Sequence, residues 1–218
     1  SRGEKRGNLI LNYATQTKRP PGSSLKPLSV YAPALEEGVI TYGSVYDDTP
    51  LWFNGTEPYP HNLPDVYKGL TTINSAVERS VNTVAMKVLE DLTIDVSFDY
   101  LTNRLGFDYL VDYAEDSSGR GYTDKGLAAL ALGQLNYGVT VRDLAAAYTT
   151  FPTGGIYYES HSYLYVYDSD GNLLLSNDSA GEIVFSEQTS YIMTKMLQNV
   201  VNNGTGRSIT LRNSMDVA

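Results

Sequence analysis

The chain has 218 residues and a formal net charge of −9, and 42% of its residues are hydrophobic and 19% charged. These values are typical of one folded domain with a sizeable core. The excess of carboxylates argues against nucleic-acid binding, because no cluster of Lys or Arg offsets it. The chain has no cysteine, which excludes disulfides, thiol catalysis and cysteine-based zinc sites.

The first third of the chain predicts one helix between two irregular segments. Residues 9–17 are typical of a short strand or extended segment, which Pro20-Pro21-Gly22 ends. Apolar residues at helical spacing then predict a helix over 23–37, with Gly38 as its stop. Residues 39–70 are rich in Pro, Gly, Asn and Asp and predict a long loop. Loops of this length often line a functional cleft.

The remaining chain predicts more helices and one hairpin. Helical patterns cover residues 71–79, 83–92, 95–104 and 125–132. Thr140 to Asp143 resembles a capping box at the start of a further helix, and Ser186 caps a last helix that ends near residue 202. Alternating residues in 156–176, with a turn at 168–171, predict a β-hairpin. The predicted fold class is α+β and helix-rich, with an incomplete strand component.

The sharpest candidate for chemistry is the pair Ser23 and Lys26. A serine hydroxyl is a poor nucleophile until a nearby base removes its proton. Residues three apart share one face of a helix, so the Lys26 amine can reach the Ser23 hydroxyl. The free amides at a helix start could also stabilise an oxyanion. A serine three residues before a lysine is expected about once by chance in such a chain, so the pair alone is weak evidence.

Ser80-Val81-Asn82, between two predicted helices, is the second candidate. The Ser80 hydroxyl could relay a proton, and the Asn82 amide could hold a substrate carbonyl or the lysine. Taken alone, the two residues are better explained as an ordinary helix cap, since Ser and Asn are favoured at helix starts.

Together the two elements match a signature shared by penicillin-binding proteins and active-site-serine β-lactamases. Further similarity to class A penicillin-binding proteins lies in residues 12–16, 19–27, 31–38, 132–133, 138–140, 144–148 and 194–205, and in Pro60, Asn62, Tyr67 and Gly69. The chain therefore resembles, over nearly its whole length, the transpeptidase domain of that family. The implied fold is that of a penicillin-binding transpeptidase, an antiparallel sheet flanked by helices. This chain would hold the helix-rich part of that fold.

The resemblance implies a D,D-transpeptidase. Such an enzyme attacks the terminal D-Ala-D-Ala bond of a peptidoglycan stem peptide, releases D-alanine and passes the acyl group to an acceptor amine on a neighbouring strand. Ser23 would be the nucleophile, with its N–H as half of the oxyanion hole, and Lys26 the base for acylation. Ser80 would help to protonate the leaving group, and Asn82 would position the acyl-donor backbone. β-Lactams would acylate the same serine because they mimic the D-Ala-D-Ala end.

The family's third motif, Lys-Thr/Ser-Gly on a sheet-edge strand, is absent from the sequence. The resemblance places that motif just beyond Ala218 and places the family's first sheet strands before Ser1. We therefore expect residues 1–218 to be a partial transpeptidase domain, unless the parent has lost the motif and is inactive. The parent would carry a glycosyltransferase domain upstream and a membrane anchor, and would work at the extracytoplasmic face of the bacterial cell membrane.

Two alternative functions stay open. A serine β-lactamase shares the fold and the acylation chemistry, but it needs a base placed to activate water, and the sequence offers no clear candidate. A non-catalytic β-lactam receptor or structural partner in a cell-wall assembly could keep a serine that still acylates.

No metal ion or other cofactor is expected. His61 and His161 are isolated, without a carboxylate or second histidine at ligand spacing. Residues 168–172 resemble a calcium loop only in part, because their glycine is at the fourth position rather than the sixth.

Overall fold

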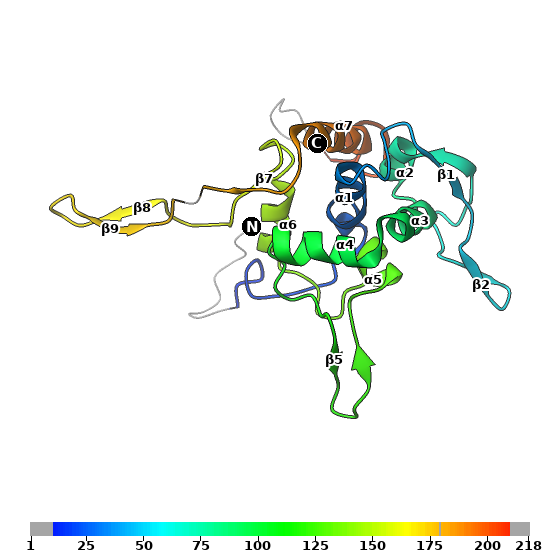
Figure 1. The fold of residues 1–218 in the computed structure, drawn as a ribbon, viewed down its shortest axis with the longest axis horizontal. Coiled ribbons are helices and arrows are strands. Elements are labelled where there is room, and N and C mark those ends of the chain that lie inside the picture. Colours follow the sequence, from blue (N-terminus) through cyan, green and yellow to red (C-terminus); the bar gives the residue numbers. More distant parts are fainter. Residues whose placement is uncertain (1–10, 179, 210–218) are drawn as a thin grey trace.

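The first helical segment lies at the centre of the molecule (Figure 1). The structure, a computed structural model, describes residues 11–178 and 180–209. The segment consists of a 3-10 turn, a π-helical turn and a short α-helix: η1 (Gly22–Leu25), η2 (Pro27–Tyr31) and α1 (Ala32–Glu36). Residues 25–34 are all buried, and Gly38 follows with a φ of +71°. The predicted helix over 23–37 is confirmed, although its turns are of three kinds.

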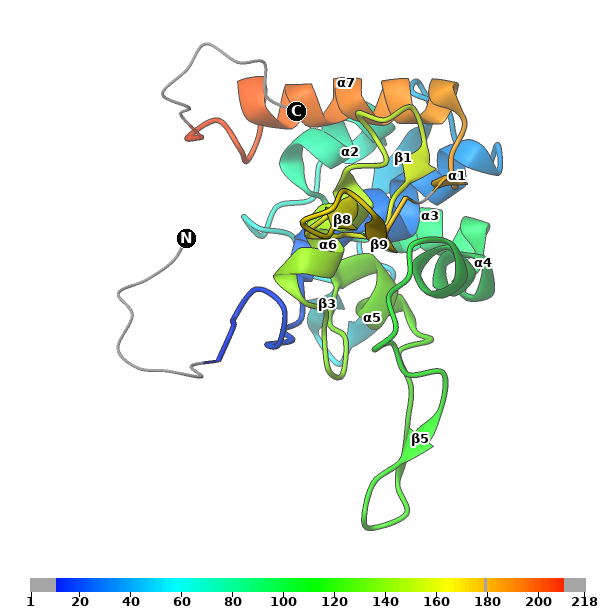
Figure 2. The ribbon, with the colours of Figure 1, turned by 90° about the vertical axis from the view of Figure 1, so that its left-hand side faces the viewer.

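The other helices surround this segment. They are α2 (Ile73–Arg79), α3 (Asn82–Leu92), α4 (Ile94–Asp99), η3 (Tyr100–Arg104), α5 (Leu127–Leu132), α6 (Val141–Tyr148) and α7 (Glu187–Asn203). α3, α4, α5 and η3 contact η2, while α7 runs along one side of the molecule against α1 and α2 (Figure 2). None of the helices in residues 11–178 and 180–209 is both long and apolar enough to span a bilayer.

Side-chain caps explain where three of the helices begin. Thr72 accepts a hydrogen bond from the Ser75 amide (3.2 Å) at α2, and Thr140 accepts one from the Asp143 amide (3.1 Å) at α6. Ser186 accepts a hydrogen bond from the Thr189 amide at the start of α7. These bonds satisfy amides that have no partner within the helix. The boundaries predicted at Thr140 and Ser186 are confirmed.

The strands form two-stranded antiparallel sheets. They pair as β1 (Val45–Asp48) with β4 (Gly69–Thr72), β2 (Trp52–Asn54) with β3 (Glu57–Tyr59), β5 (Ala114–Glu115) with β6 (Gly121–Tyr122), β7 (Ile156–Tyr157) with β10 (Glu182–Ile183), and β8 (Tyr165–Tyr167) with β9 (Leu173–Ser176). The β2–β3, β5–β6 and β8–β9 hairpins project from the helical body (Figure 1). The predicted hairpin in 156–176 is confirmed as β8–β9.

Two local predictions were wrong. Residues 39–70 were predicted to be a loop, but they contain β1, β2, β3 and the start of β4, which are short and interrupted by Pro and Gly. Residues 11–17 form no strand, and residues 13–16 form a turn, in which the Asn12 side chain accepts a hydrogen bond from the Ala14 amide (3.0 Å). Residues 9 and 10 lie outside the described residues. The α+β class is confirmed, and every sheet of the described residues has two strands.

Candidate active site

The backbone before Ser23 is held against the loop that follows α5. Arg19 and Val139 exchange two backbone hydrogen bonds of 3.1 and 3.0 Å, and the Gly22 amide donates to the Gly133 carbonyl (3.3 Å). Gly133 has a φ of +67°, and a Cβ atom there would lie 2.1 Å from the Gly22 carbonyl oxygen. Only glycine fits at this position. The close approach of the two backbones therefore sets where the Ser23 turn lies.

Lys26 is buried in the centre of the site, with 2% of its surface exposed. Its Nζ atom donates hydrogen bonds to the Ser80 carbonyl oxygen (2.8 Å), Ser80 Oγ (3.2 Å) and Asn82 Oδ1 (2.6 Å). Burial disfavours the charged amine and lowers the pKa of Lys26 to about 7. A lysine with this pKa is available as a base near neutral pH.

Ser80 adopts a left-handed backbone conformation, with φ 56° and ψ 45°, at the end of α2. This conformation is costly for a residue other than glycine and often marks a functional site. It ends α2 and directs the Ser80 carbonyl to Lys26. Val81 is the N-cap of α3, without a side-chain capping bond. The explanation of Ser80 and Asn82 as an ordinary cap of α3 was therefore wrong.

A buried polar network holds Asn82 in place. Its Nδ2 donates to the His61 carbonyl (2.6 Å), and its backbone amide donates to Asn62 Oδ1 (2.9 Å). Asp48, which is fully buried, accepts hydrogen bonds from Asn62 Nδ2 (2.7 Å) and Thr83 Oγ1 (2.6 Å). Sequence reasoning missed Asp48 and Thr83, because a single buried carboxyl in a polar segment leaves no periodic signal.

A cavity of about 260 Å³ lies over these groups, lined by Ser23, Lys26 and Ser80 among others. Asn82 does not line this cavity and reaches it through its bond to Lys26. The hydroxyl of Tyr148, on the cavity wall, donates to the Ser24 carbonyl (2.7 Å) and so steadies the Ser23 turn. The structure thus brings all four predicted site residues to one place. Ser23 lies in η1, Lys26 between η1 and η2, Ser80 at the end of α2, and Asn82 at the start of α3.

The description of His61 as isolated was wrong. Its Nδ1 lies 3.1 Å from Asp65 Oδ2, four residues later in the chain. Both side chains are about half exposed, at 47% and 56%. The pair belongs to the irregular segment before β4, where the lack of periodicity concealed it.

The fold is α+β, Ser23, Lys26 and Ser80 line one cavity, and Asn82 is bonded to Lys26. This arrangement matches the signature shared by penicillin-binding proteins and active-site-serine β-lactamases. The model of the family described as "Penicillin binding protein transpeptidase domain" matches residues 2–218. The chain belongs to this family.

Named relatives agree with this assignment. The chain is 33% identical over 196 residues to penicillin-binding protein 1A of Clostridium botulinum, an alignment that covers 86% of this chain and 22% of that protein. It is 36% identical over 204 residues to penicillin-binding protein 1A of Streptococcus oralis, covering 92% of this chain and 30% of that protein. The chain thus spans less than a third of the length of these relatives.

Solved structures confirm the predicted fold. The D,D-transpeptidase domain of a peptidoglycan glycosyltransferase from Eggerthella lenta matches with a TM-score of 0.75 at 20% identity, over 97% of this chain and 55% of that one. Penicillin-binding protein 1A of Haemophilus influenzae matches with a TM-score of 0.67 at 25% identity, over 90% of this chain and 32% of that one.

Proposed function

We propose that the protein is a D,D-transpeptidase that cross-links peptidoglycan stem peptides through an acyl-enzyme on Ser23, and that β-lactams acylate the same residue. The observation that carries this proposal is the buried Lys26 amine. Its pKa is lowered to about 7, and it lines one cavity with Ser23 and Ser80. Family membership supports the reaction class.

In the acylation step, neutral Lys26 accepts the proton of Ser23 Oγ as that oxygen attacks the carbonyl of the penultimate D-alanine. The Ser23 N–H, in the first turn of its helix, stabilises the oxyanion. Ser80 passes its hydroxyl proton to the departing D-alanine amine as the C–N bond breaks, and it takes the proton that Lys26 received from Ser23 in return. Asn82 holds the acyl-donor backbone.

In the second step an acceptor amine attacks the acyl-enzyme, forms the new amide and returns the proton to Ser23 Oγ. A base must take the proton that the attacking amine loses, and we assign this role to Lys26, which has given its proton to Ser80 and lines the same cavity as Ser23. This sequence needs no metal ion or other cofactor.

We also propose that residues 1–218 are part of a larger parent with a glycosyltransferase domain and a membrane anchor, active at the extracytoplasmic face of the bacterial membrane. The support is the length of the relatives and the name of the Eggerthella lenta protein, a peptidoglycan glycosyltransferase. The Lys-Thr/Ser-Gly strand would complete the site from beyond Ala218.

The test is intact-mass analysis of the full-length protein after treatment with penicillin. We expect one covalent adduct, absent in Ser23→Ala and retained in Ser24→Ala. Ser24 is a matched control because it neighbours Ser23 but donates its hydroxyl to the Pro21 carbonyl (2.7 Å). Release of D-alanine from a stem-peptide analogue should follow the same pattern.

Two results would contradict the proposal. An adduct retained in Ser23→Ala would remove Ser23 as the nucleophile. Fast multiple turnover of penicillin would identify a β-lactamase instead.

A further inference from the structure

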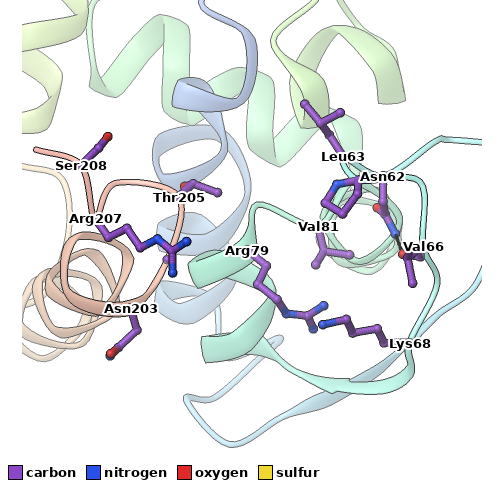
Figure 3. Close-up of a pocket in the computed structure, with 12 residues that line it drawn as sticks. Asn62, Leu63, Val66, Lys68, Arg79, Val81, Asn203, Thr205, Arg207 and Ser208 are labelled. Atoms are coloured by element: carbon purple, nitrogen blue, oxygen red, sulfur yellow. Dashed lines mark hydrogen bonds between the residues drawn. The ribbon is translucent and has the colours of Figure 1, made fainter.

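A second cavity, of about 380 Å³, lies beside the turn between α2 and α3 and contains three cationic side chains (Figure 3). Lys68 comes from the segment before β4, Arg79 from the end of α2, and Arg207 from the residues after α7. Figure 3 shows the Arg79 guanidinium directed toward the Lys68 amine, with Arg207 on the opposite wall. We call this cavity the cationic subsite.

Among the described residues, none of the three cationic side chains has an acidic partner. No Asp or Glu lines the cavity, and no carboxylate forms an ion pair with any of the three within residues 11–178 and 180–209. Arg79 instead donates to the hydroxyls of Ser75 (3.2 Å) and Thr71 (3.5 Å). Three cationic side chains thus gather in one cavity of a protein whose net charge is −9. Their mutual repulsion would be relieved by a bound anion.

Neighbouring acidic residues do not serve this purpose. Glu78, next to Arg79 in the chain, accepts a hydrogen bond from Asn199 Nδ2 (2.6 Å). Asp65 is paired with His61. Within residues 11–178 and 180–209, the positive charge of the subsite therefore stays available for a ligand.

The cationic subsite adjoins the serine cavity. Thr205 lines both cavities, while Ser80 lines the serine cavity and the next residue, Val81, lines the subsite. Asn62, which accepts a hydrogen bond from the Asn82 amide, also lines the subsite. A peptide bound over Ser23 would thus have the three cations in the neighbouring cavity.

We propose that the cationic subsite binds a carboxylate in the acyl-donor peptide, on the part that remains attached to Ser23 after acylation. The inference rests on the proposed function. Arg79 is the principal contact, because its guanidinium is partly buried, already oriented by two hydroxyls, and can bind a carboxylate through two parallel hydrogen bonds. Lys68 and Arg207 are exposed and add to the attraction.

The test compares two peptide thioesters that differ only in one side-chain group of the acyl part, a carboxylate in one and the matching carboxamide in the other. Each acylates Ser23 with loss of the thiol, and intact mass gives the second-order rate constant in the full-length protein. We expect Arg79→Gln to slow the carboxylate thioester about tenfold, the effect of one charged hydrogen bond, and the carboxamide thioester less than about twofold. Arg79→Gln should weaken the binding of the carboxylate thioester and leave its limiting acylation rate, at saturating thioester, unchanged.

Two further variants make the result decisive. Arg207→Gln removes an exposed charge without a described partner, and it should also slow the carboxylate thioester selectively. Arg120→Gln, at an exposed arginine of the β5–β6 hairpin, should change neither thioester.

Equal rates for the two thioesters in every variant, or equal slowing of both by Arg79→Gln and Arg207→Gln, would overturn the subsite. If penicillin still acylates Ser23 in that case, the proposed function stands without the subsite. If the unmodified protein gains no penicillin adduct, the proposed function itself fails.

Discussion

Lys26 Nζ and Asn82 Oδ1 lie 2.6 Å apart, although 56 positions separate the two residues in the chain. The bond joins the central helical segment to the start of α3. Three acceptors at the amine favour its charged form, while burial favours the neutral form, and the outcome is a pKa of about 7. The site therefore contains a lysine that is both oriented and able to lose its proton.

Replacement of Lys26 by methionine should abolish most of the reaction with penicillin. Methionine keeps a long side chain in the buried position but cannot accept the Ser23 proton, so we expect acylation to slow by about 10²–10⁴-fold. Lys87→Met is the matched control, since Lys87 Nζ donates hydrogen bonds to the Asp47 carbonyl and the Thr49 hydroxyl but does not line the serine cavity. Acylation of Lys26→Met at the unmodified rate would remove the lysine from the mechanism.

The rate of acylation should depend on pH through Lys26. Below pH 7 the amine is increasingly protonated and cannot act as a base, so the rate should fall about tenfold for each pH unit. Above pH 7 the amine is mostly neutral and the rate should level off. The measurement is the second-order rate constant with penicillin from pH 5.5 to 9, with folding checked by circular dichroism at each pH. A rate that still rises about tenfold per pH unit between pH 8 and 9 would show that burial does not lower the Lys26 pKa to about 7.

Thr83→Val should destabilise the protein through Asp48. The change conserves shape but removes a donor from a fully buried carboxyl group, so the free energy of unfolding should fall by about 1–3 kcal/mol. Thr102→Val is the control, because the Thr102 hydroxyl bonds only the Phe98 carbonyl within its own helical segment, and its cost should stay within about 0.5 kcal/mol. Urea denaturation measures both variants, and equal costs would contradict a special role for the Asp48 network.

Gly133→Ala should disturb the Ser23 turn. The added Cβ would lie 2.1 Å from the Gly22 carbonyl oxygen, so the backbone must move in addition to the strain of a positive φ. We expect a loss of about 3 kcal/mol or more in unfolding free energy and slower acylation. Gly119→Ala separates the two effects, because Gly119 has a φ of +77° with no atom within 4 Å of an added Cβ. It should cost about 1 kcal/mol and leave acylation unchanged.

Local patterns in the sequence were enough for most helices and for one half of the site. The spacing of Ser23 and Lys26 depends only on helical periodicity, and the starts of α6 and α7 depend on the capping side chains of Thr140 and Ser186. Such features involve residues within one turn of each other. They can be predicted from the sequence because no distant contact has to be known.

The tertiary structure alone decided how Ser23 and Lys26 meet the second pair of site residues, Ser80 and Asn82. The left-handed conformation of Ser80, the bonds from Lys26 to Ser80 and Asn82, and the buried Asp48 all depend on packing between segments distant in the chain. The low pKa of Lys26 has the same origin, since burial is a property of the assembled core. The sequence by itself determined which chemical groups are present and that Ser23 and Lys26 share one helical face. Only the folded chain set the distances between the site residues and the charge state of Lys26. Distances and charge state both arise from contacts between residues that are not neighbours in sequence.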